Sequence, residues 1–219
     1  MNNLSAAIYM TAQGIPFLQA GEEMLRTKID ASGGFVENSY NSPDSVNSIK
    51  WDTLEDETYQ NVYHYYKGLI AFRKAHAALR LTNADDVNAN ITSVDGLDEN
   101  VLAFQINGGV NVETSDGIFV IFNPNSAETS VTLPDGAWDV CVDADHAGTE
   151  ALTTVAGSVS VEPISAMVLV KSDKEPVNST EITSADDSSK KSAVSTGMII
   201  AGVAAVVAGA LALFFRKKK

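Results

Sequence analysis

The chain has 219 residues, of which 45% are hydrophobic and 20% charged, so most of it can fold around an apolar core. Its net charge is −13, but six of the 15 basic residues lie after residue 189, whereas all 28 acidic residues lie before it. The first 189 residues therefore carry a net charge of −19, which repels phosphate backbones and argues against nucleic acid as a partner. With Cys141 as the only cysteine, an intrachain disulfide is excluded, and the histidines lack the spacing of a metal site. We therefore expect no metal and no other cofactor.

The first 80 residues are predicted to contain two helices. Residues 3–13 form the first, because apolar residues recur along them at helical spacing, and residues 54–79 form the second for the same reason. Between them, the short apolar run 15–20 indicates a buried strand, and residues 21–51 form a long polar loop rich in Gly, Asn and Ser. Helix, strand, loop and helix make less than a domain, because a single strand has no partner with which to bond.

From residue 85 the hydrophobic pattern changes to a period of two, interrupted by turn residues such as those in 123–125 and 134–136. Regular short strands of this kind favour an antiparallel β-sandwich over residues 85–172, with a domain boundary at 80–84. The predicted strands are 101–106, 118–122, 128–133, 138–142 and 158–170.

The end of the chain has the composition of a membrane anchor. Residues 173–196 are rich in Ser, Thr, Asp and Lys, which predicts a disordered spacer. Within the predicted transmembrane helix 197–215, a stretch of uncharged residues rises about 27 Å as a helix, close to the thickness of a bilayer core. The basic tail 216–219 should stay cytoplasmic, placing the bulk of the chain outside the cell. Because the N-terminus lacks a signal peptide, we expect the true start of the protein to lie upstream.

Catalytic chemistry is not evident from the residues alone. Glu22 and Glu23 are adjacent, so by themselves they cannot form the carboxylate pair of a glycosidase. The first 80 residues nevertheless resemble type I pullulanases, which are starch-debranching members of the alpha-amylase superfamily of glycoside hydrolases. The resemblance covers roughly residues 4–172. It is carried by 14–23 (GIPFLQAGEE), 25–28 (LRTK), 37–47 (ENSYNSPDSVN), 51–52 (WD), 65–70 (YYKGLI) and 73–76 (RKAH).

The resemblance implies a (β/α)8 barrel followed by an antiparallel sandwich, with residues 1–80 forming the last helix–strand–helix of the barrel. The long loop would then line the substrate cleft. The residues implied to contact glucan are Tyr40, Asn41 and Asp44, followed by Asn38 and Arg26. The family's three catalytic carboxylates come from earlier barrel strands, so no catalytic residue is assigned in this chain.

The sequence thus predicts a barrel remnant, an all-β antiparallel sandwich and one transmembrane helix. It suggests the C-terminal part of a cell-surface enzyme of a Gram-positive bacterium that hydrolyses α-1,6 links in pullulan, starch or glycogen fragments. Its expected partners are an α-glucan and the membrane. Two alternatives stay open: a membrane-tethered glucan-binding or adhesion module without activity, and another member of the superfamily, of the neopullulanase or isoamylase type. The fragment alone is predicted to be inactive.

Overall fold

The computed structural model describes residues 1–176. The predicted transmembrane helix, the basic tail and all but the first four residues of the predicted spacer lie outside this range. Within residues 1–176, no helix combines the length and the apolar character that crossing a bilayer requires.

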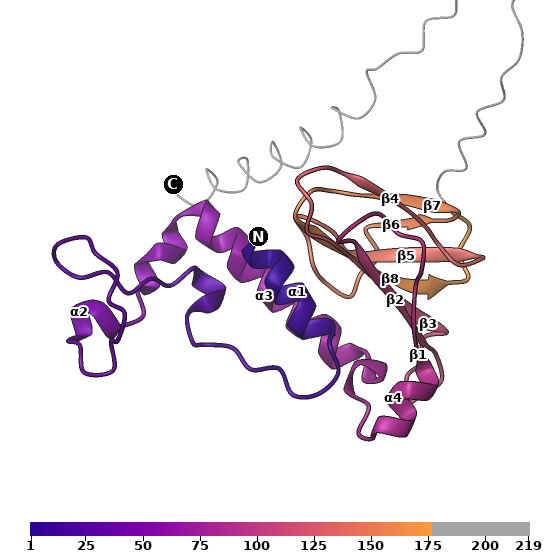
Figure 1. Cartoon of the computed structure of the whole chain (residues 1–219), viewed down its shortest axis with the longest axis horizontal. Helices are drawn as coiled ribbons and strands as arrows, with labels where there is room; N and C mark the ends of the chain where they lie inside the picture. Colours follow the sequence, from indigo (N-terminus) through magenta and orange to yellow (C-terminus); the bar gives the residue numbers. More distant parts are fainter. Residues whose placement is uncertain (177–219) are drawn as a thin grey trace, which may run out of the picture. The chain divides into compact units, whose positions relative to one another are not determined.

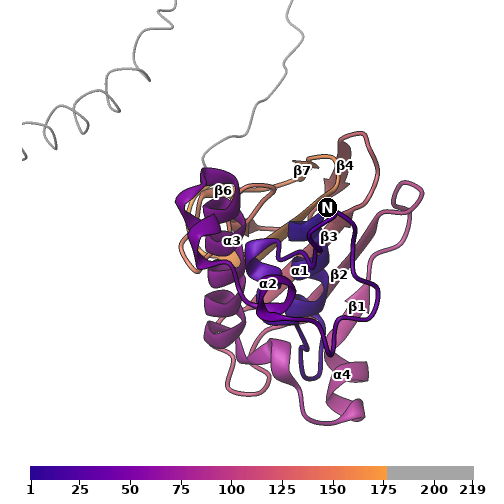
Figure 2. The ribbon, with the colours of Figure 1, turned by 90° about the vertical axis from the view of Figure 1, so that its left-hand side faces the viewer.

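Two helices form one layer of the molecule, as predicted. Helix α1 (Asn2–Thr11) packs against α3 (Glu57–Ala75), and Figure 2 shows both in front of the sheet. The side chain of Asp56 caps α3 by accepting a hydrogen bond from Thr58 N (2.8 Å). The predicted helix 54–79 is shorter than expected, because its ends tighten into the 3₁₀ helices η2 (Trp51–Glu55) and η3 (Ala77–Arg80).

The end of α1 is held by a buried arginine of α3. Arg73 donates hydrogen bonds to the carbonyls of Met10 (2.7 Å), Ala12 (2.7 Å) and Gly14 (2.5 Å). The last carbonyls of a helix have no hydrogen-bond partner within the helix. A guanidinium group that reaches them therefore satisfies acceptors that would otherwise be buried without a hydrogen bond. Arg73 therefore fixes the two helices against each other.

The strand predicted at 15–20 is absent from the structure, so this prediction is wrong. The segment carries no regular secondary structure, and Ile15 and Phe17 are 97% and 94% exposed. A strand exists only when a neighbour satisfies its backbone groups, and no strand within residues 1–176 pairs with this segment. The loop that follows contains η1 (Glu22–Met24) and the short helix α2 (Asp44–Asn47).

Residues beyond the helices form a six-stranded antiparallel sheet and a two-stranded sheet (Figure 1), which confirms the predicted antiparallel β-fold. The order in the large sheet is β1-β2-β3-β8-β5-β6, and β4 pairs with β7 in the small one. The bounds are β1 Ile91–Ser93, β2 Leu102–Asn107, β3 Gly117–Asn123, β4 Thr129–Thr132, β5 Ala137–Val142, β6 Thr153–Val155, β7 Ser158–Val161 and β8 Ser165–Ser172.

Beyond residue 80, the sequence pattern does not predict three short elements of the structure, namely α4 (Ala84–Asn90), β1 and β6. The run predicted as one strand at 158–170 is in fact two strands in different sheets. Pro163 and Ile164 separate them; proline removes a backbone donor, and Ile164 has a φ of 52°. This left-handed residue turns the chain from the small sheet into the centre of the large one.

The large sheet is buried on both faces. One face packs on α1 and α3 through a core that includes Leu4, Leu69, Ile118 and Val168, and the other packs on the small sheet around Trp138. Every residue of the central strand β3 is buried, which explains its continuous apolar sequence. The helical layer and the sheet thus share one core across the boundary predicted at 80–84.

Helix and sheet approach closely at Gly68 of α3. A Cβ atom added there would lie 1.9 Å from the carbonyl oxygen of Ala147, in the connection between β5 and β6. Only glycine allows this contact between a helix and a backbone.

Candidate functional site

The predicted glucan contacts lie in a stretch that we call the loop lobe, residues 21–56, which projects at the left of Figure 1 around α2. Its central feature is a turn in which Ser42 N donates to Ser39 O (2.9 Å). The Asn47 side chain braces the turn by donating to the carbonyls of Ser39 (2.7 Å) and Ser42 (2.9 Å). Tyr40 and Asn41 therefore sit at the apex of a braced turn.

A small hairpin formed by residues 28–36 contacts this turn. Val36 N donates to Lys28 O (2.9 Å), and the Lys28 ammonium group donates to Ser39 Oγ (2.6 Å). The Asp30 carboxylate organises the tip of the hairpin by accepting from the Ser32 hydroxyl (2.6 Å) and from the backbone N–H groups of Gly34 (3.1 Å) and Ser32 (2.8 Å). These hydrogen bonds lower the pKa of Asp30. The sequence pattern predicts only a loop here, although the run Asp-Ala-Ser-Gly-Gly at 30–34 is a recognisable turn signal.

Arg26 lies at the base of the lobe and serves its architecture. Its guanidinium group donates to the carbonyls of Ala20 (3.0 Å) and Asn47. Its aliphatic stem crosses Gly21, where an added Cβ would lie 2.6 Å from Arg26 Cδ. Of the five predicted glucan contacts, Arg26 is therefore the one whose side chain already binds backbone carbonyls.

The other four predicted contacts present their side chains to solvent. Tyr40 is 87% exposed, and Asn38, Asn41 and Asp44 are also exposed. None of these four side chains makes a hydrogen bond with another group of residues 1–176. A phenol ring, two amides and a carboxylate with unused hydrogen-bonding capacity can stack on a sugar ring and bind its hydroxyls. Their contact with glucan stays a prediction.

The lobe is joined to the helical layer through Glu22. Its Oε1 accepts hydrogen bonds from the phenols of Tyr9 of α1 (2.7 Å) and Tyr66 of α3 (2.8 Å), and Asn2 also donates to the Tyr66 oxygen (3.1 Å). Burial acts to raise the pKa of Glu22, but the two phenols outweigh it and lower that pKa. Burial, aided by the nearby carboxylate, raises the pKa of Tyr66 to about 12. No local pattern in the sequence predicts this cluster, because its members lie up to 64 residues apart.

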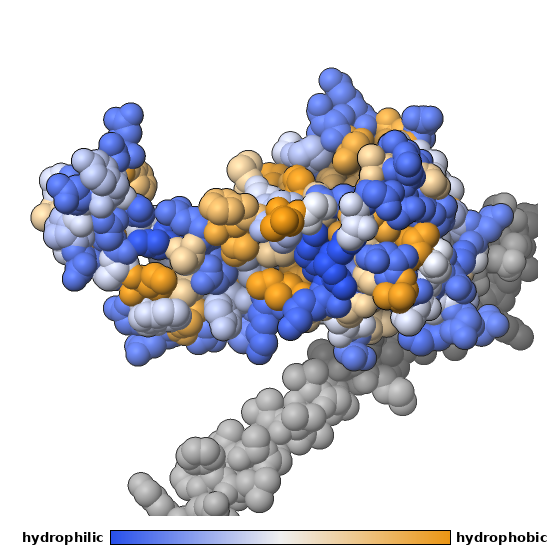
Figure 3. Space-filling model, turned by 90° about the horizontal axis from the view of Figure 1, so that it is seen from below, coloured by the Kyte–Doolittle hydropathy of each residue, from blue (hydrophilic) through white to orange (hydrophobic). Residues whose placement is uncertain are grey.

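One face of the helical layer is apolar and cationic, and we call it the bare face. It comprises the segment 14–20 and the adjoining side of α3, and Figure 3 shows apolar side chains at the surface between hydrophilic ones. Two open grooves of about 460 and 470 Å³ share Leu18 and Ile70 in their walls. The charged residues that line the same grooves are Lys67, Arg73, Lys74 and Arg80, with Glu23 as the one acidic residue.

The charges on this layer contrast with those on the sheets. Residues 1–21 contain no charged side chain, and residues 58–81 contain only basic ones, namely Lys67, Arg73, Lys74 and Arg80. Residues 82–176 are strongly acidic, with two lysines as their only basic residues. The bare face is thus a basic and apolar surface on an otherwise acidic protein.

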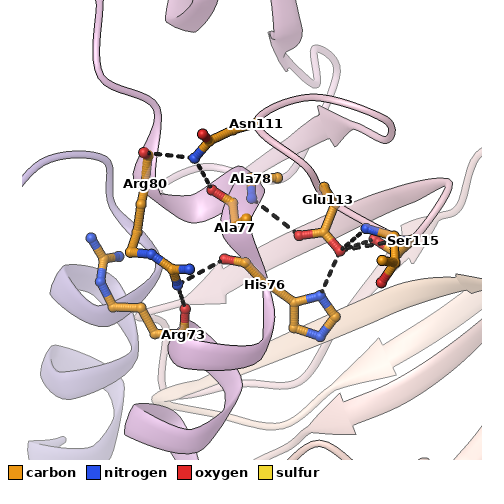
Figure 4. Close-up of polar contacts among 9 residues, drawn as sticks. Arg73, His76, Ala77, Ala78, Arg80, Asn111, Glu113 and Ser115 are labelled. Atoms are coloured by element: carbon orange, nitrogen blue, oxygen red, sulfur yellow. Dashed lines mark hydrogen bonds and ion pairs between the residues drawn. The ribbon is translucent and has the colours of Figure 1, made fainter.

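A buried polar junction connects the end of α3 to the connection between β2 and β3 (Figure 4). The carboxylate of Glu113 accepts from the N–H groups of Ala78, Thr114 and Ser115 at 3.0–3.1 Å and from Ser115 Oγ at 2.9 Å. His76 Nδ1 lies 3.1 Å from Glu113 Oε1.

Further hydrogen bonds extend the junction. Asn111 donates to the carbonyls of Ala77 (2.8 Å) and Arg80 (2.9 Å). Gln13 reaches the same segment from the end of α1, donating to Ala78 O (2.9 Å) and accepting from Leu81 N (2.9 Å). The loop lobe therefore rests on a layer that is held to the sheets by a network of hydrogen bonds, of which the one from Ala78 N to Glu113 is buried.

Within residues 1–176, no group of three or more His, Cys, Asp and Glu side chains is placed to hold a metal ion. Two of the three histidines are paired with carboxylates, His76 with Glu113 and His146 with Asp143. Burial raises the pKa of the Cys141 thiol to about 11, so it is not a thiolate at neutral pH.

Comparison with known proteins shows which family the chain resembles. Residues 87–146 match the family model described as "Pullulanase, all-beta domain". The matched residues include strands β1 to β5, so this part of the sheets resembles the all-beta domain of pullulanases. The chain is 37% identical over 132 residues to the pullulanase of Bacillus subtilis (strain 168), a match that covers 60% of this chain and 17% of that protein. It is 31% identical over 147 residues to the isoamylase of Flavobacterium sp., covering 58% of this chain and 18% of that protein.

Solved structures extend the similarity to the helical layer. The pullulanase of Bacillus acidopullulyticus superposes with a TM-score of 0.71 at 36% identity, covering 78% of this chain and 20% of that one. A pullulanase of Paenibacillus barengoltzii, solved with maltohexaose and alpha-cyclodextrin, gives a TM-score of 0.66 at 35% identity, covering 78% and 25%. The chain therefore spans about a fifth of the length of these relatives.

Proposed function

We propose that this chain is the C-terminal part of a pullulanase-type glycoside hydrolase that cleaves α-1,6-glucosidic links in pullulan, starch or glycogen fragments. The observation that carries the proposal is the match to the Bacillus acidopullulyticus enzyme, at 36% identity and a TM-score of 0.71 over 78% of the chain. Similarity at this level, in both fold and sequence, supports shared chemistry more strongly than shared fold alone would.

In this proposal, residues 1–80 are the last part of a (β/α)8 barrel and residues 85–172 the β-domain that follows it. The bare face supports the assignment, because the side chains of Ile15 and Phe17 are exposed to solvent and two apolar grooves lie open on the same face. The remaining barrel elements would cover this surface. The catalytic carboxylates belong to those elements, so the chain by itself is inactive, and its contribution to the site is the loop lobe with Tyr40, Asn41 and Asp44.

We place the enzyme at the cell surface. Residues 173–196 would act as a spacer, 197–215 as a single membrane span and 216–219 as a cytoplasmic basic tail, with the bulk of the chain outside a Gram-positive cell. The support is the sequence, in which an uncharged apolar stretch is followed at once by four basic residues.

An immunoblot of source-cell membranes tests the proposal. Antibodies against residues 85–172 should detect a band well above 23.2 kDa, the mass of this chain, and the immunoprecipitated material should release reducing sugar from pullulan. The purified chain alone should release none. Hydrolysis by the chain alone would contradict the assignment of the catalytic groups to other elements.

A second candidate is a tethered glucan-binding module without activity, favoured by the exposed polar and aromatic side chains of the loop lobe. It predicts a native band at about 23 kDa and binding of pullulan without cleavage. The same blot therefore separates the two candidates.

A further inference from the structure

Exposed aromatic rings are concentrated on the loop lobe. Only four aromatic side chains of residues 1–176 are largely exposed, and three of them belong to the lobe: Phe35 (80%), Tyr40 (87%) and Trp51 (65%). The fourth, Phe17, lies on the bare face. By contrast, the other tryptophan, Trp138, is 1% exposed in the core between the sheets. Single exposed apolar residues are ordinary, but three exposed rings within residues 35–51 leave the lobe with several aromatic faces open to a ligand.

The segments that carry these rings are tied together. Phe35 pairs with Ile29 in the hairpin, whose Lys28 bonds Ser39 at the start of the turn that carries Tyr40. Trp51 follows Lys50, whose ammonium group donates to Ser48 Oγ (2.5 Å) and to the carbonyl of Asp44 (3.4 Å) in α2. The hairpin, the turn and the start of η2 therefore form one hydrogen-bonded unit.

We infer that Phe35 and Trp51 join Tyr40 in a stacking surface for a linear α-glucan chain. The inference rests on the proposed function and adds two residues to the glucan contacts predicted from the sequence. The C–H face of a glucose ring packs on an aromatic face, while its hydroxyls need polar partners. Asn38, Asn41 and Asp44 supply exposed amide and carboxylate groups on the same unit.

A carbohydrate fits this surface better than an apolar protein segment does. The rings alternate with polar side chains that make no hydrogen bonds within residues 1–176, and a protein partner would have to satisfy those groups as well. An open-chain glucan carries hydroxyls at every unit and meets both requirements. Related pullulanases have been solved with maltotriose, maltotetraose and maltohexaose, which are ligands of this class.

Tryptophan fluorescence of the full chain tests the inference, with maltohexaose as the probe and a detergent that carries no glucose. Because Trp138 is buried, Trp51 should account for most quenching by acrylamide. Maltohexaose should shift the emission to shorter wavelength and protect against the quencher. Trp51→Phe should abolish this optical response yet keep binding, measured by retardation in a pullulan-containing gel, since a stacking ring is retained.

Truncations complete the test. Trp51→Ala and Phe35→Ala should each weaken retardation about 3- to 10-fold, whereas the matched control Phe17→Ala should leave it unchanged. If the wild-type chain binds glucan while both truncations bind equally well, the stacking surface is refuted and the glucan role of the lobe stands. If the wild-type chain does not bind at all, the stacking surface and the lobe's glucan role are both overturned.

Discussion

Replacing Glu113 should cause a large loss of stability. Its carboxylate is fully buried and accepts from three backbone N–H groups, the Ser115 hydroxyl and the His76 ring. A buried donor left without an acceptor costs about 1–3 kcal/mol, and the costs within one network are not additive. For Glu113→Ala we expect the free energy of unfolding to fall by about 4 kcal/mol, because several donors around one buried carboxylate lose their acceptor at once.

Urea unfolding followed by far-ultraviolet circular dichroism measures this effect, with the exposed Glu128→Gln as the control. Because domains are commonly stable by only about 5–15 kcal/mol, the variant should unfold at much lower urea concentration. Glu113→Gln should lower the free energy of unfolding by less, about 2 kcal/mol. The glutamine keeps one acceptor oxygen, but its NH₂ group faces other hydrogen-bond donors. A loss below about 1 kcal/mol for Glu113→Ala would refute the view that this junction holds the helical layer to the sheets.

The same residue predicts a pH dependence. Burial acts to raise the pKa of Glu113, but hydrogen bonds from Ala78, Ser115 and His76 outweigh it and hold that pKa below its ordinary value. A depressed carboxyl pKa contributes stability that is fully present above the unfolded-state pKa of about 4.3 and is lost as the pH falls through the folded-state value. The free energy of unfolding should therefore fall less steeply with acidification in Glu113→Gln than in the wild type.

Three other substitutions test separate parts of the structure. Arg73→Met removes three carbonyl contacts at the end of α1 and should lower the free energy of unfolding by about 3 kcal/mol, measured by urea unfolding. Gly68→Ala should lower the melting temperature: helix propensity gains about 1 kcal/mol, but the contact of the new Cβ with the Ala147 carbonyl costs about 1–3 kcal/mol or more. Asn47→Ala removes both braces of the Ser39 turn and should speed proteolysis within the loop lobe, whereas Asn61→Ala should not.

The sequence predicted the elements whose pattern is set by one buried face. Helical spacing located α1 and α3, and alternation located β2, β4 and β5. The edge strands β1 and β6 have three residues each, too few for a period to be visible. At residues 15–20 the sequence predicted a strand that the structure lacks. The apolar composition of this run suits a strand, but a strand also needs a neighbouring strand to pair with, and composition does not reveal whether one is present.

The candidate site was predictable only in part. The resemblance located the loop and named five residues, but it could not separate Arg26, which bonds backbone carbonyls, from residues whose side chains are exposed. The contacts that shape the lobe join residues far apart in the chain, such as Tyr66 and Glu22, and neither residue carries a local sign of the pairing. Trp51 is recognisable as exposed only once the fold shows that no core lies beside it.

Stability and glucan binding should be separable in this protein. The Glu113 junction and the Arg73 contacts lie in the layer beneath the loop lobe, whereas Asn47 and Lys28 act within the lobe itself. Below its melting temperature, a Glu113→Gln chain keeps the Glu22 contacts that seat the lobe, so its retardation by pullulan should match that of the wild type. Asn47→Ala should behave in the opposite way, with nearly normal unfolding but weaker retardation, because the turn that presents Tyr40 has lost its brace. Parallel losses of stability and binding in both variants would mean that the lobe has no shape independent of the core.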